Sequence, residues 1–412
     1  MCETKGTTRG TDDVAAGELQ ADVLVAGGGI AGIAAAAAAA RGGKNVLLIE
    51  REYGLGGMAT LGLVTIFLPL CDGNGRQLVY GLGEELLKLS IKHGAEANYP
   101  HAWLDGGSDE EKKQHRYLVQ FNPHLFALAA ERFLIGLGVN ILYGTLCTGV
   151  DTADGRIERL YFENKSGRGF ARAASYIDCT GDADICALSS APTALHSGGN
   201  GLASWYYYLD AGKAKLKMFG LADKPPKNEG AHDGAYDAAI TESIGDMRFS
   251  GVNGSELSSA VIAAHEKMYE DILAEMAISS DCVPVTISSI PLVRMSRRLA
   301  GEYTLDESEA QKPMADSIGM TGDWRKRGPA FEIPFGTLYT QAVKNLLAAG
   351  RDISVTDAMW DVTRVIPPCA VTGEAAGTAA SITSDFTTIE IAKLQKRLVA
   401  SGVKLHLADI PR

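Results

Sequence analysis

An apolar run from Val23 to Ala40 constrains the fold of this chain more than any other segment. Its length raises the question of a membrane span, which takes roughly 20 apolar residues. Three consecutive glycines, Gly27-Gly28-Gly29, interrupt the run after a short β-type stretch and before a tract of alanines. A membrane helix would not favour such a cluster in its first third, so the pattern predicts a strand, a glycine turn and a helix.

A second apolar stretch, Val46–Ile49, ends in the acidic residue Glu50. The order strand, glycine turn, helix, strand and acid is that of the βαβ unit that binds dinucleotides. Glu50 lies where a carboxylate can accept hydrogen bonds from a ribose diol. The segment therefore predicts a nucleotide-binding α/β domain.

Each glycine of the turn has a physical role in such a unit. Gly27 permits the tight turn out of the strand, Gly29 lets the backbone approach a pyrophosphate, and Gly32 lets the helix lie close to the sheet. The helix starts near Ile30 and Ala31, where unpaired N–H groups would point at the phosphates.

Composition excludes several classes of protein. The net charge of −11 over 412 residues argues against a phosphate-backbone partner, so no nucleic acid is expected.

Residues 1–19 are polar, lack a signal-type apolar segment and are predicted to form a disordered leader. With no further stretch of membrane-spanning length, we expect a cytoplasmic protein without a membrane association. The cysteines are scattered, without a CxxC or zinc-type pairing, and predict no metal site.

Periodicity places further elements along the chain. Helices are expected at 81–92 and at 122–136, the second opened by Asn122 as N-cap and Pro123 in the first turn. A strand is expected at 139–143, a hairpin at 150–162 that turns at Asp154-Gly155, and a short strand at 176–179.

The segment 191–331 differs in character, with aromatic strands such as Trp205–Leu209 and a helix at 255–276. We interpret it as an inserted, mainly β (α+β) substrate domain. The nucleotide-binding domain would then be discontinuous, formed by 20–190 and 332–412, because the nucleotide-type pattern resumes after the insert.

Two distant segments extend the nucleotide-binding pattern. One is a strand that ends in Thr180-Gly181-Asp182, and the other is Gly350-Arg351 followed by an alanine-rich helix near Ala370–Gly377. With the βαβ unit, these segments resemble those of the glutathione-reductase-like flavoproteins, and within them the family of FAD-dependent oxidoreductases. The resemblance runs from about residue 20 to 385 and includes segments 294–303, 333–339 and 360–367.

The resemblance implies FAD as cofactor and assigns residues to its parts. Gly27, Gly29 and Gly32, with Ile30 and Ala31, would hold the pyrophosphate, and Glu50 with Arg51 the adenosine ribose. The remaining implied contacts are Gly57, Met58, Ala59 and Thr60 at the ribityl chain and flavin edge, Thr145 and Leu146 at the adenine, Thr180, Gly181 and Asp182 at the nucleotide end, Gly350 and Arg351 near the ribityl phosphate, and Ala370, Val371, Thr372 and Gly373 beneath the flavin pyrimidine.

The last helix would do more than bind if 370–373 start it beneath the flavin. Its positive end would then stabilise negative charge at the N1–C2=O edge of a reduced flavin. An ordinary alanine-rich packing helix is the alternative.

Two motifs that the sequence lacks restrict the class of reaction. The sequence shows no second GxGxxG motif and no cysteine pair after Gly57, which argues against a separate NAD(P)H domain and against dithiol relay chemistry. We therefore expect hydride transfer between flavin N5 and a small organic substrate. A redox-neutral flavoenzyme of the hydratase or isomerase type stays open, as does a flavin subunit of an electron-transfer complex. A homo-oligomer also stays open.

The residues that handle substrate are the least constrained. Arg294 and Arg298 would share one face of an extended strand and suit a carboxylate, with salt bridges to surface acids as the alternative. Arg364 precedes the flavin-contacting segment, and His196 is a candidate acid/base group.

Overall fold

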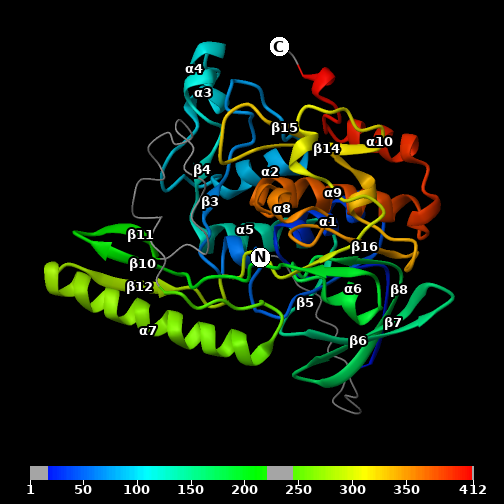
Figure 1. Ribbon diagram of the computed structural model, residues 1–412, viewed down its shortest axis with the longest axis horizontal. Helices are drawn as coiled ribbons and strands as arrows, with labels where there is room; N and C mark the ends of the chain where they lie inside the picture. Colours follow the sequence, from blue (N-terminus) through cyan, green and yellow to red (C-terminus); the bar gives the residue numbers. More distant parts are fainter. Residues whose placement is uncertain (1–16, 220–244, 411–412) are drawn as a thin grey trace, which may run out of the picture.

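The framework of the molecule is one mixed sheet. The computed structural model describes residues 17–219 and 245–410. Within these ranges the sheet has seven strands in the order β5-β2-β1-β8-β7-β6, with β16 also paired to β8 (Figure 1). Its strands are β1 (Glu18–Ala26), β2 (Val46–Ile49), β5 (Asn140–Leu142), β6 (Leu146–Ala153), β7 (Arg156–Asn164), β8 (Gly167–Asp178) and β16 (Leu346–Ala348).

Strand β8 joins two kinds of pairing. Its residues 170–178 pair parallel with β1, its last three residues pair parallel with β16, and Leu346 lies opposite Tyr176. Its first half pairs antiparallel with β7, and Asn164 lies opposite Gly167. The parallel part β5-β2-β1-β8-β16 is the sheet of the predicted nucleotide-binding α/β domain, a Rossmann-type arrangement, and the β6–β7 hairpin extends it. The predicted α/β fold class is therefore confirmed.

Several local predictions are confirmed in detail. The glycine turn leads into α1 (Ile30–Arg41), and helices α2 (Leu82–Ser90) and α5 (Pro123–Gly136) lie where periodicity placed them. The Asn122 side chain accepts hydrogen bonds from the next free backbone N–H groups and so caps α5. The hairpin turns at Asp154 and Gly155, which have φ of 52° and 71°.

Two predicted boundaries are wrong. Strand β1 starts at Glu18, so residues 18 and 19 of the predicted leader belong to the sheet, while its residues 1–16 lie outside the described residues. The alanine-rich helix α9 (Ile366–Ile382) starts at Ile366, with prolines at its N-terminal positions. Proline is compatible with a first helical turn because the N–H groups there need no intrahelical partner. Prolines read alone resemble a helix break, so the sequence predicts this start too late.

Helices α1 and α9 cover the same face of the sheet and pack closely on each other (Figure 1). A Cβ on Gly373 would lie 2.2 Å from Ala31 O, and one on Gly377 would lie 2.1 Å from Ala35 O. Only glycine allows this approach. The alanines of α1 are buried in the main hydrophobic core, so small residues on both helices set the thickness of this layer.

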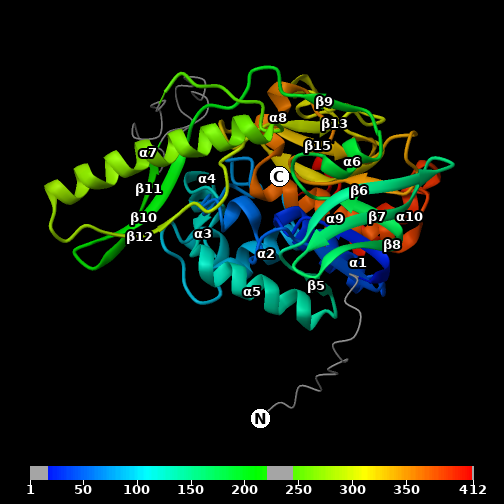
Figure 2. The ribbon, with the colours of Figure 1, turned by 90° about the horizontal axis from the view of Figure 1, so that it is seen from below.

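Part of the expected insert forms a separate layer. Strands β10 (Ser204–Asp210), β11 (Lys213–Phe219) and β12 (Val283–Ile287) make a three-stranded sheet, and the long helix α7 (Gly254–Ile278) lies along it (Figures 1 and 2). These elements are the mainly β addition that the sequence predicted. Residues 220–244 of the expected insert lie outside the described residues.

Another part of the expected insert packs on the nucleotide-binding core. Strands β14 (Ser317–Gly322) and β15 (Ala330–Pro334) form a hairpin next to α9, and Ile318 and Phe331 belong to the main hydrophobic core. The short strands β9 (Thr193–Leu195) and β13 (Arg297–Leu299) pair with each other. The domain limits at 190/191 and 331/332 stay a prediction.

Short elements complete the described chain. They are β3 (Ile66–Phe67), α3 (His101–Leu104), α4 (Asp109–Gln114), β4 (Val119–Gln120), α6 (Asp184–Leu188), α8 (Asp357–Thr363) and α10 (Ile391–Ala400). No helix in the described ranges has the length and apolar character needed to cross a bilayer. The apolar run that raised that question is divided between β1 and α1.

The α1–α9 contact predicts the effect of adding one methyl group. Gly373→Ala would force the two helices apart, and overpacking of this kind costs about 1–3 kcal/mol. Gly136→Ala on α5 is the matched control, because its Cβ would meet no atom within 4 Å. We expect urea unfolding to show a loss of stability for Gly373→Ala and no loss for Gly136→Ala. Equal stability of the two variants would contradict the packing argument.

Glu374 predicts a pH dependence of stability. This carboxyl on α9 is 3% exposed and accepts a hydrogen bond from Leu82 N at 2.8 Å, at the start of α2. Burial raises its pKa to about 7 from an ordinary value of 4.5. Between these values the unfolded chain releases the proton while the folded chain keeps it, so stability falls as pH rises through this window.

The expected loss is on the order of 3 kcal/mol between pH 4.5 and pH 7. Glu374→Gln keeps an acceptor for Leu82 N but does not ionise, so its urea midpoint should fall less than that of the natural chain between pH 5 and pH 8. Glu163→Gln, at an exposed salt bridge with Arg168, is the control. Parallel pH profiles for the natural chain and Glu374→Gln would refute the assignment.

Candidate functional site

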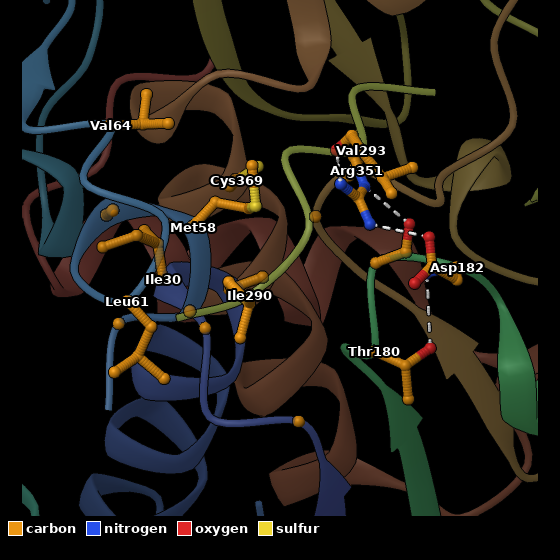
Figure 3. A pocket seen from close by; sticks show the side chains of 18 of the residues that line it. Ile30, Met58, Leu61, Val64, Thr180, Asp182, Ile290, Val293, Arg351 and Cys369 are labelled. Atoms are coloured by element: carbon orange, nitrogen blue, oxygen red, sulfur yellow. Dashed lines mark hydrogen bonds and ion pairs between the residues drawn. The ribbon is translucent and has the colours of Figure 1, made fainter. Parts of the chain in front are cut away.

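A cavity of about 550 Å³ lies at the carboxyl ends of the parallel strands. Its walls include the turns that follow β1, β2, β8 and β16, and the segment 289–294 closes it from the side of the insert (Figure 3). The predicted cofactor residues that line it are Gly27, Gly29, Ile30, Ala31, Glu50, Arg51, Gly57, Met58, Ala59, Thr145, Leu146, Thr180, Gly181, Asp182, Gly350 and Arg351. Tertiary folding thus brings the three separated segments together.

The glycines of the first turn have different surroundings. A Cβ on Gly27, whose φ is +99°, would lie 2.4 Å from Cys179 O, and one on Gly32 would lie 1.9 Å from Gly27 O. A Cβ on Gly29 would meet no protein atom within 4 Å. Gly27 and Gly32 are therefore required by the fold itself, whereas the space at Gly29 opens into the cavity.

The start of α1 faces this space without a side-chain cap. Gly29 is the N-cap residue, and no side chain accepts a hydrogen bond from the first turn. Ile30 and Ala31 line the cavity there. Backbone N–H groups of a first helical turn lack intrahelical partners and carry partial positive charge, so this end of the cavity suits a phosphate.

The Glu50 carboxylate forms hydrogen bonds to the backbone of the glycine turn and of its own loop. Its Oε2 accepts a hydrogen bond from Gly28 N at 2.5 Å, and its Oε1 accepts one from Glu52 N at 2.8 Å. Burial raises the pKa of this carboxyl, and the two backbone N–H groups oppose that rise. Each oxygen keeps a second lone pair for a ligand hydroxyl.

Arg351 ties three walls of the cavity together (Figure 3). Its Nε donates to Gly181 O at 2.7 Å, its Nη2 donates to Asp182 Oδ1 at 2.7 Å, and its Nη1 donates to Val293 O. The guanidinium group is thus bound by protein acceptors. The structure places Arg351 at the cavity as predicted, but as a link between loops.

Six predicted cofactor residues do not line the cavity, namely Gly32, Thr60, Ala370, Val371, Thr372 and Gly373. Thr60 is buried and donates from Oγ1 to Leu55 O at 2.6 Å. The four residues on α9 lie beyond its first turn because the helix starts at Ile366. Val365, Ile366 and Cys369 face the cavity in their place.

The four predicted catalytic residues separate into two pairs. Arg294 and Arg364 line the cavity, and Arg364 donates from Nε to Asp361 Oδ1 at 3.0 Å. Arg298 and His196 lie outside the cavity wall. Arg298 donates to Asp357 Oδ1 at 2.8 Å and its guanidinium lies over the Trp360 ring.

His196 belongs to the same cluster. Its Nδ1 lies 3.3 Å from Asp357 Oδ2, and its ring meets Trp360 edge-on. For Arg298 the salt-bridge alternative therefore describes the observed contact, and neither residue reaches the cavity wall.

Sequence reasoning missed the apolar half of the cavity. Leu61, Val64, Ile66 and Leu68 follow the second glycine loop, and Trp205 and Met218 come from β10 and β11. The run Ile290-Pro291-Leu292-Val293 completes this wall. An apolar run with a proline but no strand or helix period was the only signal that could have pointed to it.

The fold and the cavity together define a Rossmann-type FAD-binding protein. A family model described as FAD dependent oxidoreductase matches residues 22–204 and 216–398, which is most of the chain. The chain therefore belongs to the FAD-dependent oxidoreductase family, and FAD is its cofactor. No protein of curated function matches the sequence.

Solved structures show distant likeness. A geranylgeranyl bacteriochlorophyll reductase-like protein from Thermoplasma acidophilum is 12% identical over 94% of this chain and 84% of its own, with a TM-score of 0.48. The p-nitrophenol 4-monooxygenase from Pseudomonas putida DLL-E4 is 10% identical over 94% and 84%, with a TM-score of 0.44. Likeness at this level says nothing about the substrate of this chain.

The open space at Gly29 predicts that a substitution there weakens FAD binding and leaves the stability of the apo protein unchanged. Gly29→Ala would add a methyl group where a phosphate must approach, without touching protein atoms. We expect the apo protein to unfold at the same urea concentration as the natural chain, and its FAD dissociation constant to rise at least tenfold. Gly32→Ala is the contrast, since it should lower the stability of the apo protein as well. Unchanged FAD affinity in Gly29→Ala would contradict the predicted phosphate position.

Proposed function

We propose that this FAD-dependent oxidoreductase transfers a hydride between the flavin and a small, largely apolar organic molecule. The observation that carries the proposal is the continuity of one cavity from the uncapped start of α1 to the apolar wall of β10, β11 and 289–294. FAD, when bound, supplies a two-electron centre that accepts or donates hydride at N5. The residues of this chain bind, orient and shield the reactants.

The dinucleotide half of the cavity would hold FAD in an extended form. The start of α1 would bind the pyrophosphate and Glu50 the ribose, while Thr145 and Leu146 would flank the adenine. The second glycine loop would line the flavin half, since Met58 and Ala59 face the cavity there. The same assignments follow from the family resemblance.

The start of α9 would lie at the other end of the cofactor. Val365 and Ile366 face the cavity, and the helix dipole favours negative charge there by about 0.3–1 kcal/mol, up to about 2 kcal/mol in partly buried geometry. Pro367 and Pro368 carry no N–H, so Ile366 N is the first backbone donor available at this helix end. Electrostatic help from α9 would thus come from its dipole more than from hydrogen bonds.

The apolar wall would bind substrate and exclude water from the flavin. Trp205 and Leu292 are buried and pack with Met58, Val64 and Met218 in one small cluster. Burying an apolar group of side-chain size stabilises it by about 1.5–3 kcal/mol. The wall offers few polar contacts, so shape and apolar area would decide which molecules bind.

Three further expectations belong to this proposal. They are the cytoplasmic location, an electron-transfer partner and a homo-oligomer. The direction of hydride transfer depends on the reductant found by experiment.

Anaerobic reduction of the FAD-loaded protein tests the proposal. A panel of small apolar metabolites, with NADH and NADPH, is added and the loss of oxidised-flavin absorption is followed. We expect at least one compound to bleach the flavin. Protein that takes up no FAD, or FAD-loaded protein that no reductant bleaches, would refute hydride transfer in this cavity.

Met218→Glu tests where that compound binds. A carboxylate in an apolar wall is costly to desolvate, so the concentration needed for half-maximal bleaching should rise at least tenfold. Ile262→Glu is the matched control, because Ile262 is 70% exposed on α7. Equal kinetics of the two variants would place the substrate elsewhere.

A further inference from the structure

Asn200 is a buried polar residue that no part of the proposed chemistry uses. It lies in the loop between β9 and β10, is 1% exposed and does not line the cavity. Its neighbours Leu202, Phe249 and Val293 form a small hydrophobic cluster. A polar amide in such surroundings is tolerated only when its hydrogen bonds are satisfied.

The Asn200 side chain uses its full hydrogen-bonding capacity. Its Oδ1 accepts from Arg294 N at 2.9 Å and from Met295 N at 3.0 Å. Its Nδ2 donates to Met295 O at 2.5 Å and to Phe249 O at 3.3 Å. A side-chain amide has two acceptor lone pairs and two N–H donors, and all are matched here. Exchanging its oxygen and nitrogen would break the four contacts, so the orientation of the amide is fixed.

The backbone of Asn200 adds a second tie to the same region. Asn200 N donates to Phe249 O at 2.8 Å, and Phe249 N donates to Asn200 O at 3.1 Å. One residue thus joins the chain at 200, at 249 and at 294–295. The Asn200 side chain thus supplies the backbone groups of 294–295 with hydrogen bonds that a neighbouring strand would supply in a sheet.

The joined segment is a wall of the cavity without regular secondary structure. All residues from Ser289 to Arg294 line the cavity, and no helix or strand includes them. Ser289 N donates to Leu61 O at 2.9 Å at one end, and Val293 O accepts from Arg351 near the other (Figure 3). Besides these two contacts, Asn200 holds residues 294 and 295, where the chain passes from the cavity wall into the interior.

We propose that Asn200 is a positioning residue for ligand binding. It does not line the cavity, but it holds the 289–294 wall and thereby sets the width of the apolar half of the cavity. The part of the inference that concerns substrate rests on the proposed function; the part that concerns the wall does not.

Asn200→Asp and Asn200→Ser test the inference in the FAD-loaded full chain. Aspartate keeps the acceptor oxygen but loses both donors, and serine keeps a single hydroxyl. If aspartate prevents folding, serine still removes most of the ties. Asn345→Asp is the matched control, since Asn345 is 2% exposed, accepts from Ile157 N at 2.8 Å, donates to Ile157 O at 2.9 Å and lies outside the cavity wall.

Hydrogen exchange of the peptide 290–296 is the first measurement. The Arg294 and Met295 amides donate directly to Asn200, so we expect their exchange to become at least tenfold faster in both Asn200 variants and to stay unchanged in Asn345→Asp. Unchanged exchange in the Asn200 variants, or an equal rise in the control, would overturn the positioning role.

Ligand binding is the second measurement. Benzyl alcohol, a small apolar probe, is titrated against the flavin absorption band, and we expect its dissociation constant to rise at least fivefold in the Asn200 variants while the FAD dissociation constant changes less than threefold. An equal loss in Asn345→Asp would reduce the effect to general destabilisation and overturn the proposal. Failure of every reductant to bleach the flavin would instead refute hydride transfer and leave both measurements valid.

Discussion

The close contact between α1 and α9 is the constraint on which the rest of the structure depends. Glycines on α9 meet the backbone of α1 at Ala31 and Ala35, where no larger residue fits. Because Ala31 also lines the cavity, the same contact that closes the core places the start of α1 against the cofactor space. The first turn of α9 reaches the same space, since Ile366 and Cys369 also line the cavity. Packing and binding geometry are therefore set by one layer of small side chains.

The remaining walls are held by polar ties between loops. Arg351 joins the turn after β16 to the turn after β8 and to Val293, and Asn200 joins the adjacent residues 294 and 295 to Phe249. Such ties are strong in a buried setting, since a buried donor or acceptor without a partner costs about 1–3 kcal/mol. A cavity built from loops can thus be as well defined as one built from strands and helices.

Much of the fold could be predicted because its signals are local. The glycine turn, the Asn122 cap and the Asp154-Gly155 hairpin turn each depend on residues close together in the chain, and each was placed correctly. The start of α9 was placed too late because prolines in a first helical turn resemble a break when read alone. Arg298 and His196 were expected at the site, but their partner Asp357 lies far away in sequence and holds them elsewhere.

The sequence by itself determined the βαβ unit, the cofactor class and the glycines that the turn requires. These features depend on the backbone conformation and packing of residues that are close together in the chain. Only the tertiary structure decided which residues face the cavity and which residues serve as ties. The apolar wall at 289–294 has no period to reveal it, and the four bonds of Asn200 exist only once three distant segments meet. Long-range contacts of this kind follow from the packing of the whole chain, which no local pattern contains.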